Sequence, residues 1–379
     1  MTVAAPELPD GFSIVIPAHG RADLLLRLLA SVEAARQRSA VPVEVLVIDS
    51  TPGEGRAPVQ AACEQHGARW LSGTLSVRQK RNLGAKHAHH SWFLFLDSDC
   101  EASEGLFEAY RRFTIGADAA LAAAAGPTRF RDGETWFTRL VAHSSLLGPF
   151  RTPERPGRIL WATTSNLLVS RKVFDTLGGF REDLPFRLGG DDTDFCLRLC
   201  QAGGHVESIP DAVCYHSWQT WASPLALLRR SFRWGWVQAL LLRDYPRFRR
   251  LDGAGFPIYT LGCLLLSVAG ASFGQPMFLL LAPLYILLAL LMHAGLAALG
   301  SNSPARAFLA DLMLALVECP FGFGRVLGSL TGGRLTGVFH RLDDNDSAMD
   351  QQFPELVRDL WSDNLALLVA LVIVVGVLQ

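Results

Sequence analysis

The sequence predicts an α/β fold with a mostly parallel sheet, followed by a C-terminal helical region of membrane type. Two observations predict the sheet: short apolar runs alternate with helix-forming stretches over the first hundred residues, and two of these runs end in Asp. A third observation predicts the membrane region. Charged residues make up 19% of the 379 residues and apolar residues 50%, and the charge is scarcest in the last third. The length exceeds one ordinary domain, so two parts are expected.

The first hundred residues contain three buried-type strands with helices between them. We expect strands at 12–17, 43–49 and 92–97, and helices at 23–35 and 77–87. Ligands of parallel α/β sheets bind beyond the carboxyl ends of the strands, which is where Asp49 and Asp97 stand. Residues 100–220 are more mixed, with a strand around 161–170 and a helix from Asp192 to Ala202.

The C-terminal region reads as membrane-associated. Residues 257–273 and 277–299 are apolar runs without a charged side chain, as long as a transmembrane hairpin requires. Residues 225–250 contain arginines interspersed with Leu, Trp and Phe, which is typical of an interfacial helix. These arginines predict a multi-pass protein of the cytoplasmic membrane whose first domain faces the cytoplasm. Residues 308–330 are expected to be interfacial or re-entrant, and 365–378 to form a marginal third span.

The predicted organisation has four parts. They are an α/β domain at 1–222, an amphipathic interfacial helix region at 223–255, a transmembrane hairpin at 256–300, and interfacial or re-entrant helices with a candidate third span at 301–379. The formal net charge of −1 argues against a nucleic-acid partner. Seven scattered Cys indicate a reducing compartment, and residues 1–10 lack the pattern of a signal peptide.

Two carboxylates, Asp97 and Asp99, end the third strand in Phe-Leu-Phe-Leu-Asp-Ser-Asp. Such a pair suits a hard divalent cation, Mg²⁺ or Mn²⁺, which shares its oxygen ligands with substrate phosphates. The motif alone also fits solvated acids at a strand end, or a phosphatase that begins from a D-x-D strand.

A second acidic cluster, Asp191, Asp192 and Asp194, follows two glycines at the start of a predicted helix. One Asp at a helix N-terminus is ordinarily a cap. Three exceed what capping requires, and their mutual repulsion raises the pKa of one toward that of a general base. Capping and catalysis both remain open from this cluster alone.

Together these segments form a pattern. Five features occur in the order and approximate spacing of family-2 glycosyltransferases of the GT-A fold. They are Asp49, the Asp97/Asp99 pair, Gly178-Gly179-Phe180, the acidic cluster and Tyr215-His216. The chain resembles that family over residues 12 to about 220. Its C-terminal region resembles membrane-attached bacterial members that act on lipid-linked or cell-envelope glycans.

The resemblance implies roles for individual residues. Pro17, Ala18 and His19 would cradle the donor nucleoside, Asp49 would read its base, and Arg81 and Asp97 would lie at the donor. Asp97, Asp99 and His216 would hold the cation. Asp191 and Asp192 match the family's Glu-Asp pair, with Asp192 as the catalytic base.

Two departures stand out. The family's D-D-G-S is Asp49-Ser50-Thr51-Pro52 here, which leaves the base preference open. The Q-x-x-R-W of processive synthases has Arg230 in place of Gln, which favours addition of a single sugar over polymerisation.

The resemblance therefore implies an inverting transfer of a sugar from a nucleotide diphosphate donor to a hydroxyl of a lipid-linked or envelope glycan beside membrane lipid. The donor that the family favours is a UDP-sugar. The alternatives are a catalytically inactive membrane scaffold of the same fold and a D-x-D phosphatase. The latter requires a catalytic Lys, and none of Lys80, Lys86 and Lys172 has a convincing sequence context.

Overall fold

The computed structural model describes residues 10–118, 122–131, 135–143, 145–186, 189–251, 255–299, 303–333, 335–342 and 349–376. The chain forms two compact units. The sheet unit is Met1–Gly133 with Leu147–Thr220, and the helical unit is Glu134–Leu146 with Trp221–Gln379. The division after Thr220 lies close to residue 222, where the end of the α/β domain is expected. Nothing in the sequence indicated that residues 134–146 belong with the C-terminal residues.

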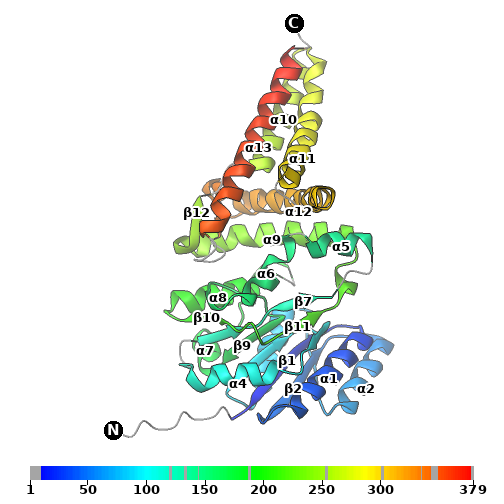
Figure 1. Cartoon of the computed structure of the whole chain (residues 1–379), viewed down its shortest axis with the longest axis vertical. Helices are drawn as coiled ribbons and strands as arrows, with labels where there is room; N and C mark the ends of the chain where they lie inside the picture. Colours follow the sequence, from blue (N-terminus) through cyan, green and yellow to red (C-terminus); the bar gives the residue numbers. More distant parts are fainter. Residues whose placement is uncertain are drawn as a thin grey trace. The chain divides into compact units, whose positions relative to one another are not determined.

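The sheet unit is built on eight strands in the order β3-β2-β1-β4-β9-β6-β10-β8 (Figure 1). Strands β1 to β4 are mutually parallel where they pair, β9 runs antiparallel to β4 and β6, and β8 runs antiparallel to β10. The predicted mostly parallel α/β sheet is therefore confirmed. The strands are β1 Phe12–Ala18, β2 Val43–Asp49, β3 Arg69–Ser72, β4 Trp92–Leu96, β6 Ala122–Ala125, β8 Gly157–Ile159, β9 Asn166–Ser170 and β10 His205–Ser208.

Helices cover both faces of this sheet, because successive side chains of a strand point to opposite faces. On β1, Ile14 lies in the core shared with α1 (Ala22–Gln37), α2 (Arg56–Gln65) and α4 (Leu106–Gly116). Its neighbour Val15 lies in the other core, with α3 (Val77–His87), α7 (Arg171–Thr176) and α8 (Asp191–Gln201). The central strands contribute buried apolar residues to both cores, as the uninterrupted apolar runs predict.

A second, three-stranded sheet has the order β5-β11-β7 and was not predicted. Its strands are β5 Cys100–Ala102, β7 Thr128–Phe130 and β11 Cys214–His216. Strands of three residues are too short to show an alternating pattern, which explains the omission. The strand expected around 161–170 is confined to β9, because residues 163–165 form a turn before it.

The helical unit contains α5 (Trp136–His143), α9 (Pro224–Asp244), α10 (Gly255–Ser272), α11 (Leu281–Leu299), α12 (Pro304–Thr331) and α13 (Met349–Gly376). The short α6 (Gly148–Arg151) belongs to the sheet unit. Within the helical unit, α9 and α12 run side by side, and α10, α11 and α13 form a bundle that rises away from them (Figure 1). A two-stranded ribbon, β12 (Arg249–Leu251) with β13 (His340–Leu342), lies beside α9.

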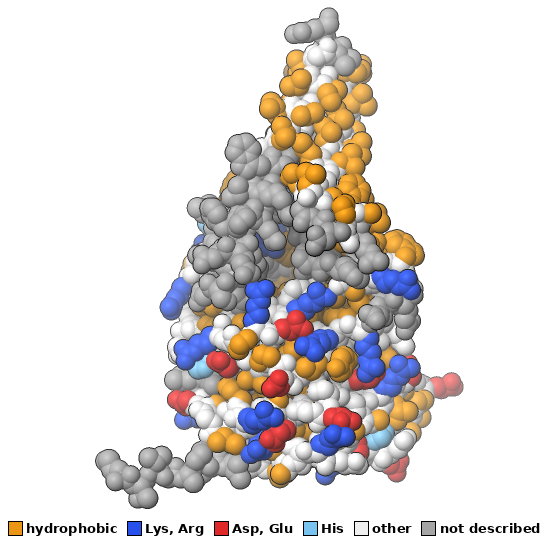
Figure 2. All heavy atoms as spheres, in the orientation of Figure 1, with side chains coloured by type: hydrophobic (Ala, Val, Ile, Leu, Met, Phe, Trp, Pro, Cys, Tyr) orange, Lys and Arg blue, Asp and Glu red, His pale blue; other side chains and the backbone are white. Residues whose placement is uncertain are grey.

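Two segments of this bundle are long and apolar enough to cross a membrane, Gly255–Ser272 and Pro276–Leu296, and Asp363–Gly376 is a shorter apolar helix. Hydrophobic side chains dominate the visible surface of the bundle (Figure 2). The stretch 308–330, expected to be interfacial or re-entrant, lies within the single helix α12, which contains Pro320.

Helices α9 and α12 touch through their backbones. A Cβ atom at Gly324 would lie 2.0 Å from the carbonyl oxygen of Phe232, and one at Gly235 would lie 1.9 Å from that of Phe321. Glycine at both positions is what lets the axes approach so closely. The arginine-bearing helix α9 is thereby fixed to α12, which in turn packs on α11.

Candidate active site

The carboxyl ends of β1, β2 and β4 meet at one edge of the sheet, as the parallel register requires. Asp49 lies there with only 1% of its surface exposed. Its Oδ1 accepts hydrogen bonds from the backbone N–H of Thr51 (3.0 Å) and the Thr51 hydroxyl (2.5 Å), and its Oδ2 accepts from Trp70 Nε1 (3.4 Å). The buried Asp49 carboxylate therefore stabilises the loop after β2 through its hydrogen bonds.

The loops after β1 and β2 are tied together. The backbone N–H of Gly20 donates to Thr51 Oγ1 (2.6 Å), and His19 Nδ1 lies 3.1 Å from the Ser50 hydroxyl. Thr51, which replaces the glycine of the family's D-D-G-S, thus bridges Asp49 to the first loop. His19 itself is exposed at this edge.

Lys80 supports the same loop from beneath. It is almost fully buried, and its Nζ donates to the carbonyl oxygen of Ala18 (2.5 Å). Burial lowers the pKa of Lys80 to about 8, although the negative charge of Asp49 opposes this shift. The ammonium group lies between the ends of β1 and β2, where donor recognition is expected.

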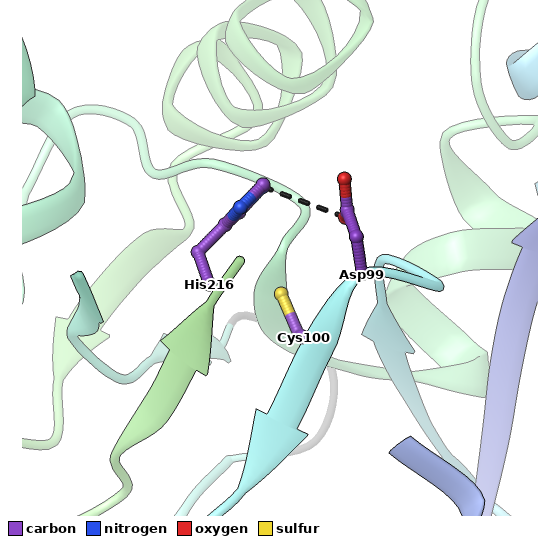
Figure 3. Close-up of side chains that lie close together, drawn as sticks. All are labelled: Asp99, Cys100 and His216. Atoms are coloured by element: carbon purple, nitrogen blue, oxygen red, sulfur yellow. Dashed lines mark ion pairs between the residues drawn. The ribbon is translucent and has the colours of Figure 1, made fainter. Parts of the chain in front are cut away.

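Asp99, directly before β5, and His216, the last residue of β11, come together with Cys100 beside them (Figure 3). His216 Nε2 lies 3.5 Å from Asp99 Oδ1, and Arg21 reaches the other carboxylate oxygen at 3.4 Å. Ligand atoms of Asp99, Cys100 and His216 all lie within 4.8 Å of one another. Burial, and then the charges of Asp99 and Asp97, raise the pKa of the Cys100 thiol well above its usual value.

The hydrogen bonds of His216 fit a cation site. Its Nδ1 lies 2.9 Å from the carbonyl oxygen of Ser217, which can only accept, so Nδ1 carries the proton. In the neutral ring, the lone pair of Nε2 then faces a carboxylate oxygen. Two acceptors face each other stably when a cation or a proton lies between them, and a backbone carbonyl on the far nitrogen is the usual support of a metal-bound histidine.

Aromatic side chains hold the His216 ring in place. Phe130 on β7 stacks on it at 4.9 Å with an interplanar angle of 17°, and Phe150 meets it edge-on at 6.1 Å. Trp218 packs on Phe130 at 4.7 Å, and its Nε1 donates to the carbonyl of Arg131 (2.6 Å). These contacts restrict rotation of the imidazole and keep Nε2 directed at Asp99.

Arg81 on α3 bridges the two acidic motifs. Its guanidinium donates to Asp191 Oδ2 (2.5 Å) and to Asp97 Oδ1 (2.8 Å), and the side chain is buried. Although burial lowers the pKa of Arg81, the two carboxylates raise it above its usual value overall. The strand end at Asp97 and the start of α8 are thus joined by one charged group.

Asp192 lies next to this bridge at the N-terminus of α8. Burial first, and then the negative charge of Asp191, raise the pKa of Asp192 to about 7, while the backbone N–H of Thr193 opposes the shift. Asp97 contributes to the same rise, so the two carboxylates share one electrostatic environment. A carboxyl group of this pKa is suited to accept a proton near neutrality.

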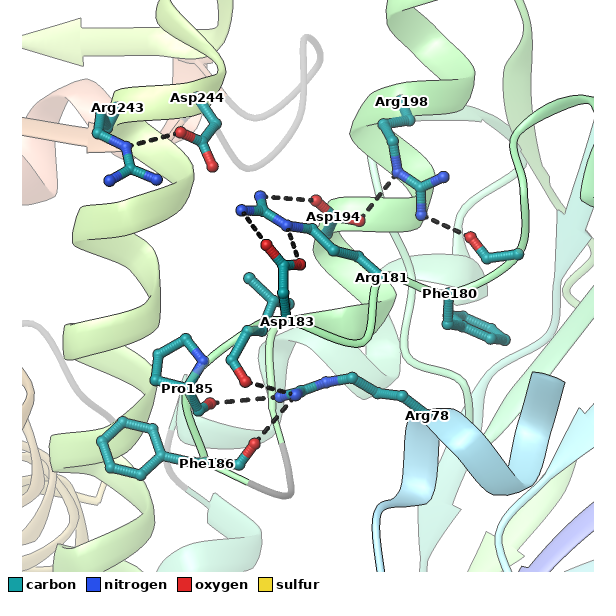
Figure 4. Close-up of polar contacts among 12 residues, drawn as sticks. Arg78, Phe180, Arg181, Asp183, Pro185, Phe186, Asp194, Arg198, Arg243 and Asp244 are labelled. Atoms are coloured by element: carbon teal, nitrogen blue, oxygen red, sulfur yellow. Dashed lines mark hydrogen bonds and ion pairs between the residues drawn. The ribbon is translucent and has the colours of Figure 1, made fainter. Parts of the chain in front are cut away.

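The segment before α8 is held by buried cations and by Asn82. Arg78 donates to the carbonyl oxygens of Leu184 (2.9 Å), Phe186 (2.9 Å), Gly189 (3.1 Å) and Pro185 (3.4 Å), as Figure 4 shows in part.

Asn82 exchanges two 2.8 Å hydrogen bonds with the backbone of Phe180. Gly179 has φ +73°, and a Cβ there would lie 2.7 Å from Asn82 Oδ1, so this position requires glycine. Asn82 of α3 therefore contacts the Gly178-Gly179-Phe180 motif directly.

The predicted residues are brought together in three groups. Asp97, Arg81 and Asp191 form one connected network with Asp192 beside it, and Asp99 with His216 forms the other. Pro17, Ala18, His19 and Asp49 line the edge at β1 and β2.

Sequence reasoning missed four residues: Arg21, Arg78, Phe130 and Phe150. The spacing of three between Arg78 and Arg81 puts both on one face of α3 and was a usable signal. Arg21, with φ 55° in the left-handed region, gave none.

Comparison with known proteins gives a family and several relatives. Residues 92–301 match the family model described as glycosyl transferase family group 2. The pre-mycofactocin glycosyltransferase of Mycobacterium tuberculosis is 30% identical over 230 residues, which are 58% of this chain and 46% of that protein. A putative polypeptide N-acetylgalactosaminyltransferase 13 of Drosophila melanogaster is 25% identical over 241 residues, 54% of this chain and 41% of that one. The chain thus spans less than half the length of these relatives.

Among solved structures, the mannosyltransferase PcManGT from Pyrobaculum calidifontis, in complex with GDP-Man and Mn²⁺, is similar with a TM-score of 0.47 and 17% identity. The similarity covers 88% of this chain and 86% of that chain.

Replacing Arg78 tests how the segment before α8 is held. Arg78→Lys keeps the charge, but one ammonium cannot serve four carbonyl oxygens in a planar fan, so we expect a lower melting temperature and a loss of roughly 3 kcal/mol in unfolding free energy. Limited proteolysis should show faster cleavage between residues 184 and 189. Arg27→Lys on the exposed face of α1 is the matched control and should change neither measurement. Equal resistance of both variants would contradict the assignment.

Proposed function

The chain belongs to glycosyl transferase family group 2, and on this premise we propose that it transfers a sugar from a nucleotide diphosphate donor to a hydroxyl acceptor with inversion at the anomeric carbon. The family match confirms the resemblance indicated by the motifs. The observation that carries the mechanism is Asp192, a carboxyl group with a pKa of about 7 next to the Arg81 bridge. The phosphatase alternative is not retained, because the family match covers the D-x-D strand itself.

Asp192 is the proposed base. Its carboxylate takes the proton of the acceptor hydroxyl, the hydroxyl oxygen forms a bond to the anomeric carbon, and the bond from that carbon to the diphosphate oxygen breaks. The nucleoside diphosphate leaves with the electron pair of that bond. General-base help of this kind typically contributes about 10²–10⁴-fold to the rate.

The residues near Asp99 fit a divalent cation. Asp99 and His216 would hold it, with Asp97 as a further oxygen donor at the end of β4. When bound, Mg²⁺ or Mn²⁺ supplies positive charge that stabilises the departing diphosphate. Arg21, which already reaches Asp99, is placed to contact the same negative charge.

The helical unit supports a membrane setting. We propose that α10 and α11 span the cytoplasmic membrane, with the apolar C-terminal part of α13 as a third span and the sheet unit on the cytoplasmic side, as the arginines of α9 favour. An acceptor that is lipid-linked or part of the cell envelope is consistent with this setting. A UDP-sugar is the proposed donor, on the resemblance to family-2 enzymes.

Asp192→Asn tests the base. The amide keeps the shape of the side chain but cannot accept the proton, so transfer should fall by at least about 10². Donor binding, measured by calorimetry with a catalytically inert nucleotide diphosphate, should stay unchanged. Asp183→Asn, an exposed acid in the segment before α8, is the control and should retain activity. Full transfer by Asp192→Asn would exclude this residue as the base.

The pH dependence gives an independent test of the same group. Because the base must be ionised, kcat/KM should rise about tenfold per unit below pH 7 and level off above it. Asp191→Asn removes a negative charge that raises the pKa of Asp192, so the midpoint should move to lower pH. A midpoint that is unchanged in this variant would show that another group sets the profile.

Chelation tests the cation. Removal of divalent ions should abolish transfer, and added Mn²⁺ or Mg²⁺ should restore it. Mn²⁺ binding without substrate, followed by electron paramagnetic resonance, should weaken at least about tenfold in Asp99→Asn and His216→Ala. Glu101→Gln, an acid two residues from Asp99 that pairs with Arg131, is the matched control and should bind as the unaltered protein does. Undiminished binding by both site variants would refute the site.

A further inference from the structure

Helix α9 lines a hollow with a volume of about 710 Å³, formed by Ala226, Leu228, Arg229, Arg230, Phe232 and Arg233. This size is in the range of sites that hold small ligands. The lining combines three guanidinium groups with two large apolar side chains. We propose that this hollow binds the phosphate headgroup of an anionic phospholipid.

The charges of α9 are the first argument. Arg229 and Arg233 lie one helical turn apart on one face, and like charges at this spacing repel each other. Neither makes an ion pair with any acidic side chain in the part of the chain that the structure describes. The one acid of the helix is Asp244 at its far end, where it pairs with Arg243 at 2.7 Å. A phosphate group between the two guanidiniums would remove the repulsion, and arginine is well suited to bind one.

The second argument is the chemistry around these charges. Arg230 lies over the ring of Trp221, at 4.4 Å from its centroid, and Arg233 Nε donates to the carbonyl oxygen of Arg229 (3.2 Å). The guanidinium of Arg229 and the outer nitrogens of Arg233 are therefore the groups that we expect to meet the ligand. Leu228 and Phe232 give the hollow an apolar side. A free phosphate has no part that would bury against this apolar side, whereas the first carbons of an acyl chain would.

The third argument is the place of α9 within the helical unit. The glycine contacts fix α9 to α12, and α12 packs on α11, which is one of the two helices apolar enough to span a membrane. A helix anchored in this way is held where headgroups lie when the bundle is in the bilayer. Each arginine near an anionic surface adds appreciably to lipid binding.

The inference rests on the membrane setting proposed above but not on the transfer reaction, so its test measures lipid binding alone. The full chain in neutral detergent would be titrated with phosphatidylglycerol and with phosphatidylcholine, and bound lipid counted by native mass spectrometry. We expect phosphatidylglycerol to bind roughly tenfold more tightly or better. Arg229→Gln/Arg233→Gln should reduce this preference to less than about twofold.

Two further variants complete the design. Arg229→Lys/Arg233→Lys keeps the charges and should retain part of the preference, which separates loss of charge from loss of fold. Arg27→Gln/Arg36→Gln removes two exposed arginines from α1 and should leave the preference intact. Equal binding of phosphatidylglycerol by the α9 glutamine variant and the unaltered protein would overturn the proposal. So would displacement of the lipid by millimolar inorganic phosphate, which would identify a site for the free anion.

Discussion

The geometry of the site depends on one buried guanidinium. Arg81 joins Asp97, at the end of a central strand, to Asp191, at the start of α8, although the two acids are far apart in sequence. Arg81 and Asp191 are buried and Asp97 is partly exposed, and burying charged groups is costly unless each keeps its partner. Loss of one member of such a network typically costs about 3–5 kcal/mol, because a charge is then left buried without compensation. Arg81 therefore fixes the start of α8 relative to the end of β4.

The same network explains why one of three neighbouring acids differs from the others. Asp191 forms an ion pair with Arg81 at 2.5 Å, and Asp194 forms one with Arg198 at 2.9 Å. Asp192 has no ion pair among the residues that the structure describes, and it keeps a hydrogen bond from Thr193. Burial first, and then the negative charges of Asp191 and Asp97, raise the pKa of Asp192. The cluster thus combines two ion-paired carboxylates, Asp191 and Asp194, with Asp192, whose raised pKa suits it to exchange a proton near neutral pH.

Much of the sheet unit could be predicted, because its central strands are long apolar runs and its motifs are local. The helix expected at 77–87 has these bounds in the structure, and the strand ends fall at Asp49 and next to Asp97. Contacts between distant segments could not be predicted from one sequence. Three sets of contacts depend on tertiary packing, and no spacing along the chain encodes them. They are the Arg81 bridge, the hydrogen bonds of Arg78 to four carbonyl oxygens, and the hydrogen bonds of Asp49 with Thr51 and Trp70. The second sheet was not predicted for a different reason, since its strands are too short to show an alternating apolar pattern.

That second sheet is nevertheless what brings His216 to Asp99. In the antiparallel register of β11 with β5, His216 lies opposite Cys100, and in the parallel register with β7 it lies opposite Phe130. The stacking of Phe130 on His216 is therefore a cross-strand pair, and it stabilises the register that places the imidazole. A shift of one residue would turn His216 to the other face of the sheet and remove its nitrogen from the carboxylate. Three short strands, which contribute little to the core, thus decide whether the second half of the site exists at all.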